Sequence, residues 1–122
     1  MSELLQSFRD APVRVLVVWE PVVWTDAFRP KAATLTRTIT DARAAHYWDP
    51  AKSLSEHILE SPWTRKYAVR GGPQGVVWDW IACYPPGVRW ESDFPEPALQ
   101  DFPIVDGIDR VRAWLDKTLP HR

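Results

Sequence analysis

The sequence predicts a single α/β domain over residues 1–122, in which helices cover both faces of a central mixed sheet. Residues 13–19 (VRVLVVW) are almost all apolar and do not alternate with polar residues. Such a run is typical of a parallel strand that is covered on both faces. A helical pattern and a weaker strand-like run, residues 42–48 (ARAAHYW), follow it. Together they predict a β-α-β unit with parallel strands and a right-handed crossover.

Apolar residues that recur every three or four positions predict the helices. Residues 2–8 are consistent with a short helix, and residues 104–119 carry a strong stripe that predicts an amphipathic helix at the end of the chain. The helix of the β-α-β unit is expected over residues 28–39. Its Pro30 stands near the start, where the missing N–H group is least costly.

The next helix is predicted after Asp49-Pro50, with Asp49 as its N-cap and Pro50 as its first residue. The dipeptide Ser61-Pro62 should end it. A connection rich in proline and glycine follows, up to residue 75.

The second half of the sheet is predicted to be a hairpin. Residues 76–84 (VVWDWIACY) form a strong strand, Pro85-Pro86-Gly87 provides the turn, and residues 88–94 (VRWESDF) form the antiparallel neighbour. An acidic, proline-rich loop, residues 95–103, then leads to the last helix. The predicted order is β-α-β-α-β-β-α.

The composition excludes several classes of protein. Apolar residues make up 45% and charged residues 25% of the chain, which is typical of a folded domain. The net charge is −1 and no basic face is evident, so neither a nucleic-acid partner nor a membrane partner is expected. The start of the chain, MSELLQSFRD, lacks the pattern of a secretory signal, which predicts a cytoplasmic protein.

The chain is rich in tryptophan, with eight residues of this type. A small domain can use large aromatic side chains simply to build its core, and this interpretation is favoured for a typical tryptophan of the chain. Trp24 is the one for which contact with a ligand is a stronger competing hypothesis, because it lies in the loop after the first strand.

Two local stretches, together with the element order, resemble the thioredoxin superfamily. Residues 17–20 (VVWE), followed by Trp24 and a helix, are similar to the strand and tryptophan that precede the redox motif of that family. Residues 67–73 (YAVRGGP) are similar to the segment that carries its cis-proline. The resemblance implies a thioredoxin-like fold and makes Pro73 a candidate cis-proline beside a groove; a trans proline in a glycine-rich turn is the alternative.

The chain departs from this family at the residues that perform its chemistry. Aligned on Trp24, the two redox cysteines are replaced by Thr25 and Phe28, and the only cysteine of the chain is Cys83, inside a predicted strand. A dithiol oxidoreductase needs two cysteines, so this activity is excluded. Peroxiredoxin chemistry also rests on a cysteine in this region, and none stands there. Cys83 has no basic neighbour in sequence, which favours an inert, buried thiol.

The candidate site is the edge of the sheet where parallel strands end, because open α/β sheets bind ligands there. Glu20 and Asp26 could form a pair of carboxylates, with Trp24 as an aromatic wall. The simpler alternative is that Asp26 and Asp49 cap helices and that Glu20 is solvated. The predicted ligand-binding residues are Glu20, Trp24, Thr25, Asp26, Trp48, Asp49 and Pro73.

The leading hypothesis is a non-redox binding or adaptor module for a protein or a small ligand. The alternative is a glutathione-dependent or carboxylate-dependent enzyme on the same scaffold; a structural subunit is a third option. No cofactor is predicted, and no metal site, because the three histidines lack ligand spacing. A basic stretch near Lys66 and an acidic one near Glu96 are most simply solvated, but they could also pair between two copies in a homodimer.

Overall fold

The computed structural model describes residues 1–22, 30–67 and 69–119, apart from the side chain of Pro73. The chain divides into two compact units, Met1–Ser53 and Leu54–Arg122, which are described separately below. It contains α-helices, one parallel sheet and one antiparallel sheet, so the predicted α/β class is confirmed. That the two units form a single domain stays a prediction.

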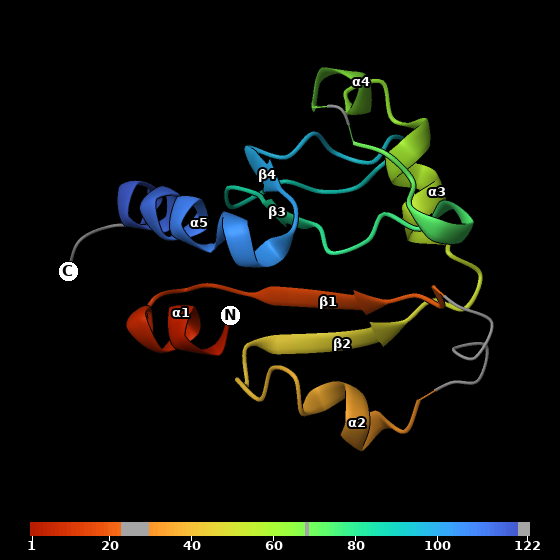
Figure 1. Ribbon diagram of the computed structural model, residues 1–122. Helices are drawn as coiled ribbons and strands as arrows, with labels where there is room; N and C mark the ends of the chain where they lie inside the picture. Colours follow the sequence, from red (N-terminus) through yellow and green to blue (C-terminus); the bar gives the residue numbers. More distant parts are fainter. Residues whose placement is uncertain (23–29, 68, 120–122) are drawn as a thin grey trace. The chain divides into compact units, whose positions relative to one another are not determined.

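The first unit is a β-α-β unit preceded by a short helix (Figure 1). Helix α1 (Ser2–Ser7) leads to strand β1 (Val15–Trp19), and helix α2 (Ala32–Thr36) connects β1 to strand β2 (Ala44–Trp48). The two strands are parallel, with Val15 opposite Ala44 and Trp19 opposite Trp48, as the sequence predicts. Of the predicted helix 28–39, the first two residues lie outside the described part of the chain.

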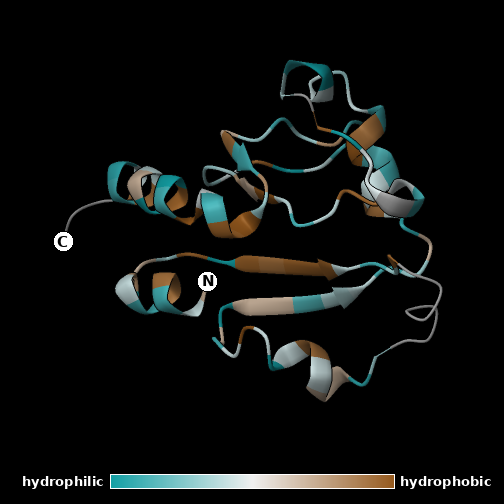
Figure 2. Cartoon of the chain, in the orientation of Figure 1, coloured by the Kyte–Doolittle hydropathy of each residue, from teal (hydrophilic) through white to brown (hydrophobic). Residues whose placement is uncertain are grey.

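Strand β1 is less covered than its composition suggests. Figure 2 shows it as hydrophobic along most of its length, yet the side chain of Leu16 is 63% exposed. On β2, Tyr47 is 53% exposed. The expectation that both faces of β1 are covered is therefore wrong. The physical reason is the size of the sheet: β1 and β2 are its only described strands, and the buried residues of this unit lie in and after the helices (Leu4, Leu5, Leu35 and Ile39).

The second unit holds the remaining elements. Helices α3 (Ser53–Glu60), which begins at the unit boundary, and α4 (Thr64–Tyr67) are followed by a 3-10 turn, η2 (Pro73–Gly75). Strands β3 (Ile81–Cys83) and β4 (Leu99–Asp101) are short, and helix α5 (Ile104–Thr118) follows them. The predicted C-terminal helix is thus confirmed, and its apolar stripe buries Val111 and Leu115.

The predicted hairpin is wrong in its partner strand. Strand β3 pairs antiparallel with β4, with Ile81 opposite Asp101 and Cys83 opposite Leu99. Residues 88–94 have no helix or strand, because Trp90 and Phe94 contribute their rings to an aromatic cluster instead. The described strands form two separate two-stranded sheets in place of the one central mixed sheet that was predicted.

The start of α3 also differs from its prediction. The helix begins at Ser53, so Pro50 is not its first residue. Pro50 and Ala51 lie in a turn in which the backbone N–H of Lys52 donates to the carbonyl of Asp49 at 3.3 Å. The φ angle of Lys52 is +60°, which is a left-handed conformation that interrupts a right-handed helix.

Gly107 in α5 has a packing role. A Cβ atom at this position would lie 2.7 Å from the Cβ of Asp101, whose carboxylate forms an ion pair with Arg110. Alanine in place of glycine inside a helix usually stabilises a protein by about 0.5–1 kcal/mol. We expect Gly107→Ala instead to lower the free energy of unfolding by about 1–3 kcal/mol, because the added methyl group overpacks the contact. Urea denaturation measures this change.

Ala113→Gly is the matched control, because Ala113 is exposed on the same helix. It should reduce the stability by about 1 kcal/mol through helix propensity alone. If Gly107→Ala were more stable than the natural chain by that amount, the packing role of Gly107 would be refuted.

Candidate functional site

The carboxyl ends of β1 and β2 bring together three of the predicted site residues. Trp19 is opposite Trp48, and the backbone N–H of Asp49 donates to the carbonyl of Trp19 at 2.9 Å. Glu20, Trp48 and Asp49 therefore share one end of the parallel sheet, and all three are half-buried. This end is where ligands bind in open α/β sheets.

The other predicted site residues are not placed at this edge by the described structure. Trp24, Thr25 and Asp26 lie within residues 23–29, outside the described part of the chain. Pro73 belongs to the second unit, where it begins the turn η2. A cis X-Pro bond occurs in the chain at Phe102–Pro103; the isomer at Pro73 stays a prediction.

A side-chain network supports the same sheet from within the first unit. The indole Nε1–H of Trp19 donates to Nδ1 of His46 at 3.1 Å, and the two rings are stacked. The other ring nitrogen, Nε2, lies 2.9 Å from the carbonyl oxygen of Ile39. Both ring nitrogens of His46 therefore have partners within the first unit, and the residue links the indole of Trp19 to the backbone at Ile39.

Arg43 ties β2 to the end of α1. Its guanidinium contacts both carboxylate oxygens of Asp41, at 2.9 and 2.7 Å. It also donates to the carbonyls of Leu5 and Phe8, at 2.8 and 2.6 Å. The hydrogen bonds from Arg43 lower the pKa of Asp41 from its usual 3.8 to about 2. No signal in the sequence indicates this network, since neither residue belongs to a motif.

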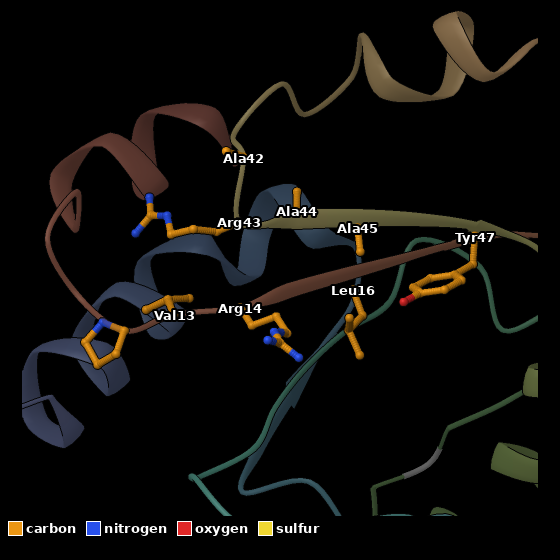
Figure 3. Close-up of a pocket in the computed structure, with 9 residues that line it drawn as sticks. Val13, Arg14, Leu16, Ala42, Arg43, Ala44, Ala45 and Tyr47 are labelled. Atoms are coloured by element: carbon orange, nitrogen blue, oxygen red, sulfur yellow. The ribbon is translucent and has the colours of Figure 1, made fainter.

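A shallow pocket of about 490 Å³ lies at the amino-terminal ends of β1 and β2 (Figure 3). Leu16, Ala45 and Tyr47 point to the same side of the sheet, whereas the guanidinium of Arg43 points towards α1. Arg14 is the exposed cation of this pocket. The guanidinium of Arg43 already donates to Asp41 and to backbone carbonyls. Arg14 is therefore the main cation that this pocket offers to an anion.

The second unit contains an aromatic cluster, which we define as Trp63, Tyr67, Trp80, Tyr84, Trp90 and Phe94. Trp63 is its centre: the side chain is only 8% exposed and stacks on Trp80 with ring centroids 6.3 Å apart. Its Nε1–H donates to the carbonyl of Phe94 at 2.9 Å. A core role is thus confirmed for Trp63, whereas Trp78 and Trp90 are exposed.

A second shallow pocket, of about 500 Å³, opens beside Trp63 and Phe94. Charged residues stand at its edge. Lys66 forms an ion pair with Glu96, with Nζ and Oε1 2.8 Å apart, and the hydroxyl of Tyr67 donates to the same oxygen at 2.7 Å. Lys66 of the basic stretch thus forms an ion pair with Glu96 of the acidic stretch within the same chain. Both hydrogen bonds lower the pKa of Glu96.

Cys83 lies in β3 and is half-buried. Desolvation raises the pKa of its thiol from the usual 9.0 to about 11. At pH 7 only about one thiol in ten thousand is then ionised, which makes Cys83 a poor nucleophile. The expectation of an unreactive thiol agrees with this environment.

Comparisons with known proteins give no relative from which a function could be transferred: neither the protein-family models, nor the curated proteins, nor the solved structures contain a match to this chain. Within the part of the chain that the structure describes, no cluster of His, Cys, Asp or Glu could hold a metal ion. The described helices also include none that is long and apolar enough to cross a membrane.

Proposed function

We propose that this protein is a thioredoxin-like binding module without redox activity, which binds a protein or a small ligand at the carboxyl ends of β1 and β2. The observation that carries the proposal is the position of Glu20, Trp48 and Asp49 at one end of the parallel sheet. The raised pKa of Cys83 argues against a thiolate nucleophile. The element order β1-α2-β2-α3, followed by β3-β4-α5, supports the relationship to thioredoxins.

The polar groups at this edge are suited to binding. Glu20 and Asp49 supply two carboxylates, and Trp48 supplies an aromatic surface beside them. The loop after β1, with Trp24, Thr25 and Asp26, follows directly in sequence and is the segment expected to complete the site. An aromatic side chain beside a few polar groups is a common composition of ligand sites.

A thermal-shift screen tests the binding function. The panel contains glutathione, nucleotides, divalent metal ions and small carboxylic acids. A ligand at about 100 times its Kd should stabilise the folded protein by roughly 2.7 kcal/mol. We expect the shift to disappear in Trp24→Ala and in Asp49→Asn. The shift should persist in Tyr47→Ala. This variant is the control, because Tyr47 lies on β2 and its side chain is 53% exposed.

An insulin-reduction assay tests the other half of the proposal. The protein should reduce insulin disulfides no faster than the Cys83→Ser variant, because a single thiol cannot resolve a mixed disulfide. Turnover well above that variant would refute a non-redox function. A shift with glutathione alone, lost in Asp49→Asn, would favour the glutathione-dependent enzyme instead.

A further inference from the structure

The pocket beside Trp63 combines aromatic walls with an acidic edge. Its lining consists of Pro62, Trp63, Lys66, Asp93, Phe94, Pro95 and Glu96. The charged members are one cation and two carboxylates, so the lining has a net negative charge. A volume of about 500 Å³ lies within the range of pockets that hold small ligands.

The two carboxylates have unused capacity for hydrogen bonds. Asp93 is exposed and makes no hydrogen bond or ion pair with the residues that the structure describes. Glu96 receives both of its hydrogen bonds, from Lys66 and Tyr67, on Oε1. Its second oxygen has no donor among the described residues. A guanidinium carries five N–H donors and can therefore supply several such acceptors at once.

The chain's own lysine shows which chemistry this edge accepts. The Nζ atom of Lys66 lies 2.8 Å from Glu96 and 5.0 Å from the centroid of the Tyr67 ring. This position combines an ion pair with a cation–π contact. The side chains of Lys66 and Glu96 are 66% and 45% exposed, so an incoming cation can reach the same groups.

We propose that this pocket binds an arginine side chain of a protein partner. The guanidinium would donate to Asp93 and to the free oxygen of Glu96, and it would lie against the exposed parts of Trp63 and Phe94. Arginine suits the pocket better than lysine, because its flat group stacks on aromatic rings and forms two parallel hydrogen bonds with a carboxylate. This proposal does not depend on the proposed function, since it concerns other residues in the second unit.

A titration followed by NMR tests the proposal. The probe is the blocked peptide acetyl-Gly-Arg-Gly-amide, and its control is the same peptide with citrulline, which has nearly the same shape but no charge. The readout is the indole N–H signal of Trp63, assigned with the Trp63→Phe variant. We expect a saturable shift of this signal with the arginine peptide and a much weaker one with the citrulline peptide.

Variants of the charged residues then test the assignment of the pocket. Asp93→Asn and Glu96→Gln should each weaken binding of the arginine peptide about two- to fivefold, the range for exposed ion pairs. Lys66→Gln should strengthen it by a similar factor, because the competing cation is removed. Glu91→Gln is the matched control: Glu91 is an exposed acid near the same loop that does not line the pocket.

Three results would overturn the proposal. The first is the absence of a saturable shift at Trp63 with the arginine peptide. The second is an equal shift with the citrulline peptide, which would mean that charge does not matter. The third is a loss of affinity in Glu91→Gln as large as in Asp93→Asn, which would indicate general attraction to an acidic surface rather than this pocket.

Discussion

Replacing Trp63 by alanine should lower the free energy of unfolding by about 3–5 kcal/mol, the largest effect expected for a single substitution in this chain. The indole is the centre of the aromatic cluster and is only 8% exposed. It stacks on Trp80 and contacts the rings of Tyr67 and Phe94. Its removal leaves a large cavity and also leaves the carbonyl of Phe94 without its donor. Urea denaturation of the natural chain and the variant gives the difference.

Two further variants separate the causes of this loss. Trp63→Phe keeps an aromatic ring but removes the N–H donor, so a smaller loss, of about 1–3 kcal/mol, is expected from the unpaired carbonyl. Trp78→Ala removes an indole that is 58% exposed and should change the stability by no more than about 0.5 kcal/mol. Equal losses in Trp63→Ala and Trp78→Ala would show that the cluster does not stabilise the second unit.

Replacing Arg43 by lysine should destabilise the first unit by about 2–3 kcal/mol, although the charge is retained. The guanidinium contacts both carboxylate oxygens of Asp41 and the carbonyls of Leu5 and Phe8 at the same time. A lysine ammonium is a compact group with three donors and cannot reach all of these acceptors. The carbonyls of Leu5 and Phe8 would then lose their side-chain donor and keep only the backbone hydrogen bonds from Phe8 and Ala11. Thermal or urea denaturation at neutral pH measures this loss.

The pH dependence of the stability provides an independent check on Arg43. The pKa of Asp41 is about 2 in the folded chain and about 3.8 without its partner. Its contribution is therefore fully present above pH 4 and is lost as the pH falls from 4 towards 2. We expect the stability of the natural chain to fall more steeply over this range than that of Arg43→Lys. Arg37→Lys is the control, because Arg37 is exposed after α2, and it should match the natural chain in both measurements. If Arg43→Lys showed the same pH dependence of stability as the natural chain, the role of the network would be contradicted.

Local patterns were sufficient to predict several elements of this protein. The β-branched run before Trp19 predicted β1, and the helical spacing from Ile104 onwards predicted α5. The parallel pairing of β1 with β2 followed from the helix between them, because a crossover connection favours parallel strands. The raised pKa of Cys83 agrees with the absence of a basic neighbour in sequence.

The candidate site was predictable only in part. The position of Glu20, Trp48 and Asp49 at one edge depends on strand ends, which local patterns indicate well. The prediction that Asp49 is the N-cap of the next helix is wrong, because the turn at Lys52 delays the start of α3 to Ser53. The arginine pocket could not be found in this way, since Trp63 and Phe94 lie on different segments and neither belongs to a motif.

The sequence by itself determined the α/β class and the presence of β1, β2 and α5, since these depend on residue types and on neighbours a few positions apart. Only the tertiary structure decided that β3 pairs with β4 across the loop that carries Trp90. It also decided that Arg43 reaches the end of α1 and that Lys66 pairs with Glu96. The physical reason is that strand pairing, aromatic packing and ion pairs depend on which distant segments meet. Many partners satisfy the same local pattern, and the lowest free energy of the whole chain selects among them.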